Sequence, residues 1–312
     1  MTSDFASAKQ LIDQSSNILL TTHERTDGDD LGSVLALGLA LRSQNKRVGI
    51  VITGGVPSRL NFMPSSDEVT EELPNQNYDL LIVSGCSTLD RVNHAGIASL
   101  QLPIINFDHH PDNTNYGTVN VVDAKKSSVA ELMFDFILWC GWKINSAMAT
   151  NLLTGIVTDT GLLMHNNTEA STLTAAGKLM SRGALISEVA KHTFSVQSPL
   201  EMRAWGQALQ NSYYNPTSKM VYAVITQEQI KQLGNPELSS FEGLVETLNK
   251  VPEAKFAMFL KEDSDGRVKG SLRSEEYKGT DVQQIARQLG GGGHKLAAGF
   301  SLSLIHIWRC RR

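Results

Sequence analysis

A polar loop with three potential metal ligands follows the first apolar run of the chain. In THERTDGDDLGS (22–33), His23, Asp27 and Asp29 are separated by four and two residues. This spacing lets His23 and Asp27 reach one cation while Asp29 faces another. Carboxylates mixed with imidazole suit Mn²⁺, Mg²⁺ or Fe²⁺ better than a thiolate-type zinc site. The same residues also fit a simple turn whose aspartates cap the next helix, and this segment alone leaves the two interpretations even.

Two further clusters of the same chemical type follow other apolar runs. NFDHHPDN presents Asp108, His109 and His110 directly after the apolar LPII, and TGIVTDTGLL ends its apolar run at Asp159. Each cluster alone is explained by a turn or by the end of a helix. Three acid or imidazole clusters in such places favour convergence at one edge of a sheet, where together they could hold two metals.

Alternating strands and helices are predicted to position these clusters. The predicted strands cover residues 17–22, 47–53, 78–85, 102–108 and 118–123. Helices are predicted over 30–44 and 127–141, the second with serines at its start and a glycine at its end. The alternation predicts an α/β fold whose first domain is built on a mostly parallel sheet. In such sheets, function collects at the carboxyl ends of the strands.

A smaller α+β domain is predicted in the second part of the chain. Helices dominate from about 145 to 212, and the polar, turn-rich NSYYNPTSK (211–219) is a candidate linker. The later strands are predicted at 220–226, 254–260 and 267–274, with helices near 227–233, 239–250 and 281–289. The predicted organisation is a first domain over 1–190, a helical connector over 191–214, a second domain over 215–301 and a non-native tail over 302–312.

Composition restricts the class of protein. The 312 residues are 41% apolar and 19% charged, which is ordinary for a globular protein of one or two domains. No apolar run approaches the roughly 20 residues of a membrane helix, and MTSDFASAKQLID does not resemble a secretory signal. Cys86, Cys140 and Cys310 form neither a disulfide framework nor a zinc pattern. We therefore expect a cytoplasmic protein with no membrane partner.

The charge balance favours small or short anionic substrates. The net charge is −4, and it becomes more negative without the three arginines of LSLIHIWRCRR, the tail that differs in style from the rest of the chain. A protein that holds long nucleic acid by its phosphates should be basic, at least locally.

The motifs HERTDGDDLGS, FDHHPDN, TDTG and GGGGHKLAAG, in this order, resemble those of the DHH phosphoesterase superfamily with its DHHA1 C-terminal domain. The resemblance covers nearly the whole chain up to about residue 301. The chain length is similar to that of the nanoRNase / phosphoadenosine-phosphate phosphatase (NrnA-like) branch. The resemblance implies a phosphoesterase, acting on short oligoribonucleotides or 3′,5′-bisphosphorylated nucleosides, with its active cleft between the two domains. It also allows for a homodimer.

The resemblance implies roles for the residues of the first domain. His23 and Asp27 would bind one Mn²⁺, and Asp29, His109 and Asp159 would bind a second, with Mg²⁺ or another divalent ion as the alternative. Two such ions about 4 Å apart can share a hydroxide that attacks phosphorus in line.

Two catalytic roles are implied for the residues beside these ligands. His110 would contact the phosphate or assist proton transfer. Asp108 would orient the histidines, because imidazoles that bind metal usually donate their other N–H to a carboxylate or carbonyl.

The glycine-rich segment implies a phosphate clamp. Consecutive glycines expose backbone N–H groups, and an arginine in GSLRSEE could bind phosphate through two nitrogens. The alternative is a flexible glycine turn before a final strand, with that arginine solvated. The expected substrate contacts are His110, Arg273, Gly292, Gly293 and His294.

One position departs from the family pattern. The family places an aspartate that bridges both metals at the end of the third strand, and in DLLIVSGCSTLDR that position is Gly85. Neither Asp79 nor Asp90 is an obvious substitute. We therefore expect impaired activity, and we expect Gly85→Asp to raise Mn²⁺ stoichiometry and turnover. A catalytically inactive nucleotide-binding paralogue, a single-strand-specific exonuclease and a metal pyrophosphatase remain as alternatives.

Overall fold

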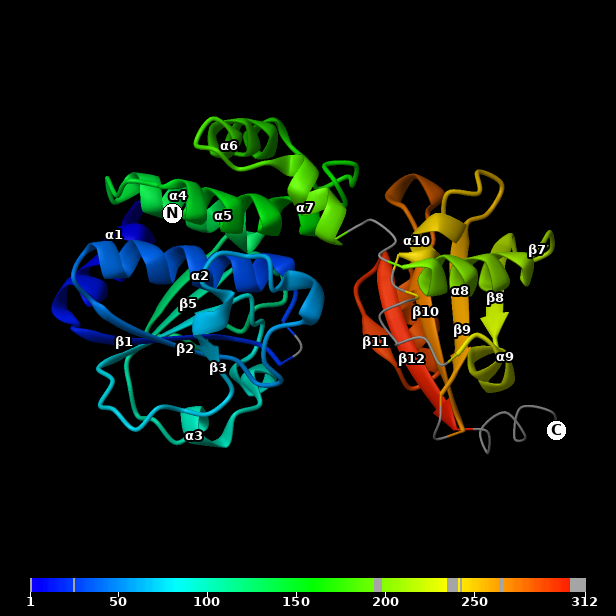
Figure 1. The fold of residues 1–312 in the computed structure, drawn as a ribbon, viewed down its shortest axis with the longest axis horizontal. Coiled ribbons are helices and arrows are strands. Elements are labelled where there is room, and N and C mark those ends of the chain that lie inside the picture. The colour runs from blue at the N-terminus through cyan, green and yellow to red at the C-terminus, as the bar shows by residue number, and fades with distance from the viewer. Residues whose placement is uncertain are drawn as a thin grey trace. The chain divides into compact units, whose positions relative to one another are not determined.

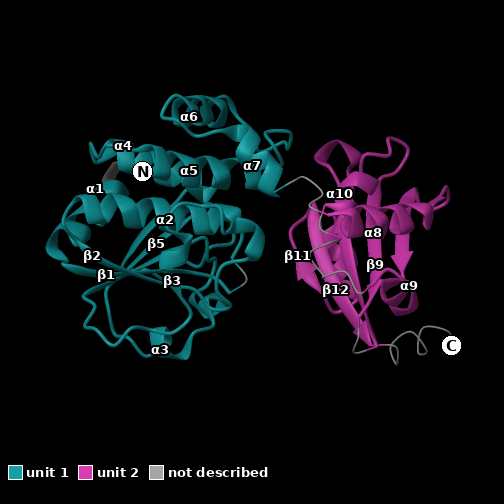
Figure 2. Ribbon diagram, in the orientation of Figure 1, with its two compact units in different colours: residues 1–195 teal, residues 196–312 magenta. Residues whose placement is uncertain are grey.

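The structure is a computed structural model with two compact units, residues 1–195 and residues 196–312 (Figure 2). It describes residues 2–24, 26–193, 198–234, 241, 243–263 and 266–303. No helix in these ranges is long and apolar enough to cross a membrane.

A six-stranded parallel sheet forms the centre of the first unit, with strand order β3-β2-β1-β4-β5-β6 (Figure 1). Its strands are β1 (Asn17–Thr22), β2 (Arg47–Val51), β3 (Val69–Thr70), β4 (Leu80–Ser84), β5 (Ile104–Asp108) and β6 (Val119–Val122). Every pairing is parallel, so all carboxyl ends lie along one edge. The strand order reverses between β1 and β4, the kind of place where open α/β sheets bind ligands.

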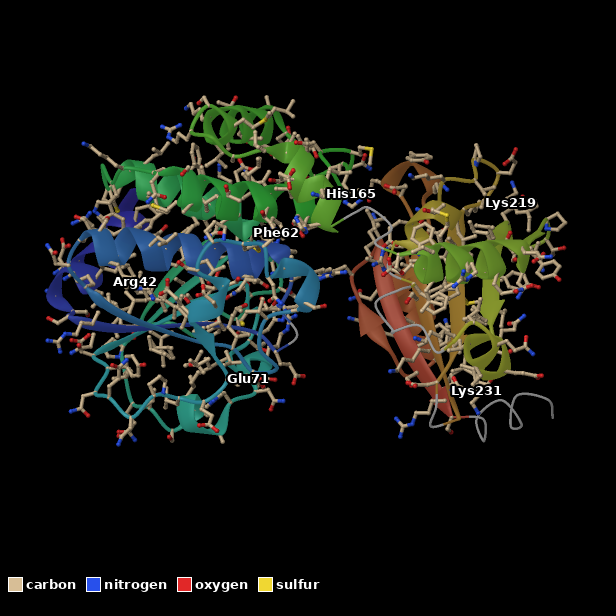
Figure 3. All side chains as sticks on the ribbon, in the orientation of Figure 1. Arg42, Phe62, Glu71, His165, Lys219 and Lys231 are labelled. Atoms are coloured by element: carbon tan, nitrogen blue, oxygen red, sulfur yellow. The ribbon has the colours of Figure 1, made fainter. Side chains whose placement is uncertain are left out.

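Helices cover the sheet on both faces, which explains why β4 and most of β1 and β5 are buried. The helices are α1 (Thr2–Gln14), α2 (Gly28–Ser43), α3 (Ala95–Ala98), α4 (Val129–Trp139), α5 (Ser146–Asp159), α6 (Ala170–Met180) and α7 (Ile186–Thr193). In β1, Ile18 and Leu20 belong to the core under α2, α4 and α5, whereas Leu19 belongs to the core on the opposite face, beside α3. Phe62, labelled in Figure 3, stacks on His192 of α7 with ring centroids 4.4 Å apart.

Glycines allow α2 and α5 to pack closely. A Cβ at Gly32 would overlap the carbonyl oxygen of Asn151 and lie 3.2 Å from its carbonyl carbon. A Cβ at Gly155 would lie 2.9 Å from Oδ1 of Asp29. The close approach brings the first turn of α2 next to the last turn of α5, where Asp159 lies.

The second unit is a mixed sheet with strand order β11-β12-β10-β9-β8-β7. Its strands are β7 (Ser212–Asn215), β8 (Met220–Ile225), β9 (Phe256–Glu262), β10 (Arg267–Arg273), β11 (Gly292–Gly293) and β12 (Ala297–Ser303). Its helices are α8 (Pro199–Gln210), α9 (Gln227–Gln232), α10 (Leu244–Leu248) and α11 (Val282–Gln288). Only β8 and β9 pair in parallel; the other pairings in the described part of this unit are antiparallel.

The predicted α/β fold is confirmed, with a parallel sheet in the first unit and a mixed sheet in the second. The prediction of a linker at 211–219 is wrong, because these residues contain β7 and the turn to β8. The Asn215 side chain accepts hydrogen bonds from the backbone N–H groups of Thr217 and Ser218, which closes a hairpin turn that polarity alone did not distinguish from a linker. Leu302 and Ser303 extend β12, and residues 304–312 of the predicted tail lie outside the described residues.

We predict that Gly32→Ala destabilises the first unit by about 1–3 kcal/mol, the usual cost of overpacking, because the new methyl group meets backbone that cannot rotate away. The matched control is Gly177→Ala in α6, where a Cβ has nothing within 4 Å. There the better helix propensity of alanine should raise stability slightly. Thermal denaturation followed by circular dichroism measures both. Equal melting temperatures for the two variants would contradict the close packing of α2 on α5.

Candidate metal centre

The loop after β1 places His23 and Asp27 at the carboxyl edge of the sheet. Asp27 is the N-cap of α2, and its Oδ1 accepts hydrogen bonds from the backbone N–H groups of Asp29 and Asp30 at 3.0 and 3.1 Å. His23 donates from Nδ1 to the carbonyl oxygen of Glu24 at 2.7 Å. Because a carbonyl oxygen can only accept, Nδ1 carries a proton, and Nε2 is the ring nitrogen that faces Oδ2 of Asp30 at 2.6 Å.

His23, Asp27 and Asp30 form the first ligand cluster, with one ligand atom from each lying within 4.8 Å of the others. Asp30 is not among the residues predicted from the sequence. It stands next to Asp29 in the first turn of α2, where an extra acid is ordinarily explained by the helix dipole. The sequence did contain a signal for Asp30, because it stands in a helix with few polar positions. Of the 16 residues of α2, 13 are buried.

Asp29, His109 and Asp159 form the second cluster, again with ligand atoms within 4.8 Å of one another. Asp29 accepts from the backbone N–H groups of Val129 and Ala130, at 2.7 and 2.8 Å, so the N-terminus of α4 holds its carboxylate. His109 follows β5, and its Nε2 lies 3.7 Å from Oδ2 of Asp159 at the end of α5. The structure therefore brings the five sequence-selected residues together in two groups.

Mutual repulsion makes these clusters favourable places for a cation. Burial raises the pKa of Asp29 to about 6 and that of Asp159 to about 8, with neighbouring carboxylates adding to both shifts. Burial, followed by three nearby aspartates, raises the pKa of Asp30 well above its ordinary value. Burial lowers the pKa of His109, but Asp159 and Asp29 outweigh it and raise that pKa to about 8. A divalent cation would offset this crowding of negative charge, and the hard oxygen and imidazole donors fit one.

Asp108 organises the turn after β5. It is fully buried, and its Oδ1 accepts from the backbone N–H groups of His109 and His110 and from Nδ1 of His110, the last at 2.6 Å. Burial alone would raise the pKa of Asp108, but its interactions with His110 and the hydrogen bond from Asn113 together outweigh burial and lower that pKa. Asp108 thus orients the His110 ring. The His109 ring is held by the carbonyl oxygen of Lys126, which accepts from Nδ1 at 3.2 Å.

Gly85 adopts a left-handed backbone conformation with φ of +67° directly after β4. A Cβ at this position would overlap Oδ1 of Asp30 and lie 2.7 Å from Oδ2. An aspartate at this position would therefore require the Asp30 carboxylate to move, and the effect of Gly85→Asp on the site stays a prediction.

Comparison with known proteins identifies the family. Residues 17–156 match the DHH family, N-terminal domain, and residues 219–307 match the DHHA1 domain. The bifunctional oligoribonuclease and PAP phosphatase NrnA of Thermus thermophilus is 30% identical over 287 residues, which cover 91% of this chain and 84% of that protein. This chain belongs to the DHH family.

Further relatives agree with this assignment of the DHH chain. NrnA of Bacillus subtilis is 30% identical over 292 residues, covering 91% of this chain and 89% of that protein. A crystal structure of an exopolyphosphatase-related protein from Bacteroides fragilis superposes with a TM-score of 0.90 at 24% identity, over 96% of this chain and 91% of that one. At this identity, the superposition supports the fold.

The DHHA1 domain contains the residues selected as a phosphate clamp. Arg273 ends β10, and its Nε lies 2.7 Å from Oε1 of Glu246 in an ion pair. Gly292 and Gly293 form β11, and the backbone N–H of His294 donates to the carbonyl oxygen of Ala297 at 2.7 Å. Gly292 and Gly293 therefore pair with β12 as a short strand, and the turn before β12 is made by residues 294–296.

The support beneath His109 gives a stability prediction. Glu131 of α4 is 1% exposed and accepts hydrogen bonds from Lys126, Ser127 and Thr172, which fixes the loop that supplies the Lys126 carbonyl. Burial raises the pKa of Glu131, but these bonds outweigh it and lower that pKa to about 2. We predict that Glu131→Gln costs about 1.5–3 kcal/mol at pH 7, the range for hydrogen bonds to charged groups.

The same carboxylate predicts the pH dependence. A depressed folded-state pKa stabilises the protein above the unfolded value near 4.5, and this stabilisation is lost as the pH falls toward about 2. Urea denaturation should therefore show the gap between wild type and Glu131→Gln narrowing below about pH 4.5. Exposed Glu72→Gln is the control and should change little. A gap of constant size across this window would show that the Glu131 charge is not involved.

Proposed function

We propose that this chain is a metal-dependent phosphoesterase that hydrolyses short oligoribonucleotides and 3′,5′-bisphosphorylated nucleosides. The observation that carries the proposal is the pair of three-residue clusters at the carboxyl edge of the first sheet. The curated relatives are named for oligoribonuclease and PAP phosphatase activities, and this chain spans 84% and 89% of the two described above. The acidic net charge of −4 supports short substrates over long strands.

We propose Mn²⁺ as the cofactor, with Mg²⁺ as the alternative. His23, Asp27 and Asp30 would hold one ion, and the second cluster, Asp29, His109 and Asp159, would hold the other. Bound divalent ions supply a hydroxide nucleophile near neutral pH and neutralise the charge that develops on the phosphoryl oxygens.

The protein's own contribution is rigidity and proton handling. The N-terminus of α4 fixes Asp29 through two backbone hydrogen bonds, and two carbonyl oxygens fix the rings of His23 and His109. His110, oriented by the buried carboxylate of Asp108, is proposed to contact the scissile phosphate and assist proton transfer. Ligands held in this way lose little conformational freedom when the substrate binds.

The DHHA1 residues Arg273, Gly292, Gly293 and His294 are proposed to contact the substrate away from the scissile bond. Arg273 is about one-third exposed, and its planar guanidinium can bind a phosphate through two nitrogens. Gly293, with φ of +133°, keeps the backbone in a conformation that only glycine adopts easily.

Activity is tested by Mn²⁺-dependent release of mononucleotide from a diribonucleotide and of inorganic phosphate from adenosine 3′,5′-bisphosphate. We predict that Asp159→Asn lowers kcat by at least about 100-fold, equivalent to about 2.7 kcal/mol, because the second cluster loses its charge from α5. Asp67→Asn, an exposed aspartate of the same unit, is the control and should retain full turnover. Nucleotide binding without turnover in the wild type would support the inactive-paralogue alternative. Faster cleavage of a forty-nucleotide strand or of pyrophosphate would redirect the assignment to an exonuclease or a pyrophosphatase.

Substrate binding by the DHHA1 domain gives a separate prediction. Arg273→Ala should weaken binding of a non-hydrolysable dinucleotide about tenfold, the loss of about 1.4 kcal/mol, because it removes a phosphate contact. It should leave Mn²⁺ affinity unchanged, because Arg273 belongs to neither ligand cluster. Arg267→Ala, at the other end of β10, is the matched control. Calorimetry measures both ligands. Unchanged dinucleotide affinity in Arg273→Ala would exclude this clamp.

A further inference from the structure

Asp30 is a buried carboxylate with an unsatisfied oxygen. It is 3% exposed, and its Oδ2 lies 2.6 Å from Nε2 of His23. Its Oδ1 is buried without a hydrogen-bond partner. An aspartate that merely supports a helix N-terminus would be solvated or hydrogen-bonded, since an unpaired buried carboxylate oxygen costs free energy. This oxygen is therefore available to bind a ligand.

The carboxylate of Asp30 occupies the space of a side chain at position 85. A Cβ built on Gly85 would overlap Oδ1 and Cγ and lie 2.7 Å from Oδ2. The two side chains cannot both hold these positions, so the glycine at 85 leaves room for the Asp30 carboxylate where it lies. The DHH motif pattern described above has its bridging aspartate at this place.

Helix geometry directs Asp30 toward the region between the two clusters. Asp27 and Asp30 are three residues apart and lie on the same side of the first turn of α2, which explains their shared cluster with His23. Asp29 directly precedes Asp30 and projects about 100° from it, toward the second cluster. Asp30 lies close to carboxylates of both clusters and of the turn after β5. It is repelled by the negative charges of Asp27, Asp29 and Asp108.

The other aspartates near position 85 do not take this place. Asp79 lies at the opposite end of β4, where its carboxylate accepts from the backbone N–H groups of Ser16 and Asn17. Asp90 is exposed on the short 3₁₀ helix Leu89–Val92.

We infer that Asp30 replaces the bridging aspartate, so that α2 supplies from residue 30 the carboxylate that the family supplies from the end of β4. This inference rests on the proposed two-cation site. It removes the reason to expect impaired activity from Gly85 alone, because the charge is present in the site and only its position in the sequence differs.

Four full-length proteins test the exchange: wild type, Asp30→Ala, Gly85→Asp and the double variant Asp30→Ala/Gly85→Asp. Calorimetric titration with Mn²⁺ should find two ions per chain in the wild type. Asp30→Ala should weaken the affinity for the second ion to bind at least tenfold, whichever cluster holds that ion, because the bridging charge is lost. Gly85→Asp should also weaken it, because the new side chain collides with Asp30. The double variant should regain the second ion, since one carboxylate again occupies the shared space.

Two further variants separate this role from a structural one. Asp90→Ala removes an exposed carboxylate from the loop after β4 and should bind two ions normally. Asp30→Asn keeps the side-chain shape, so it should fold even if Asp30→Ala does not. Its metal-free melting temperature should not fall, because a repelling charge is removed, while the rise in melting temperature on adding Mn²⁺ should shrink.

The outcomes separate the inference from the proposed function. Two tight Mn²⁺ ions in wild type, Asp30→Ala and Asp30→Asn alike would overturn the role of Asp30 and leave the phosphoesterase proposal standing. A double variant that binds no better than Asp30→Ala would also overturn it. A wild type that binds no Mn²⁺ would overturn both.

Discussion

Repulsion among four closely spaced aspartates is the constraint on which the first unit depends. Asp27, Asp29 and Asp30 stand within four residues at the start of α2, and Asp159 reaches the same region from the end of α5. Carboxylates this close cannot all stay ionised unless positive charge or hydrogen-bond donors face them. The surrounding structure supplies donors first, because the N-termini of two helices, α2 and α4, point into the cluster and their backbone N–H groups bind Asp27 and Asp29.

The same constraint explains several features that are not themselves ligands. Glycines at 32 and 155 let α2 and α5 pack closely enough for acids on different helices to share a site. Glu131 fixes the loop whose carbonyl oxygen orients His109, and Asp108 fixes the turn that carries His110. The carboxylates of Glu131 and Asp108 are hydrogen-bonded within the described residues, whereas Oδ1 of Asp30 is not. The contrast separates groups that build the scaffold from a group that the scaffold presents to a ligand.

Most of the fold and five of the six residues in the two ligand clusters were predictable from the sequence. Apolar runs marked the strands of the parallel sheet, and the polar residues directly after β1 and β5 marked its functional edge. Asp30 was missed because sequence spacing does not tell that both first-turn acids face inward; that depends on how α2 packs against α4 and α5. The hairpin of β7 was read as a linker because turn residues look alike in both settings, and the distinction lies in a pairing partner farther along the chain.

Gly85 shows why the site is better defined in space than in sequence. From an alignment of motifs, a glycine in the place of a ligand means the loss of a charge. In three dimensions, the volume beside this glycine contains a carboxylate from another element, and the left-handed backbone there suits glycine in its own right. A metal responds to the positions of donor atoms and to net charge, and it is indifferent to which strand or helix carries them. Two residues that exclude each other sterically can therefore exchange a chemical role, and replacing only one of them would crowd the site or empty it.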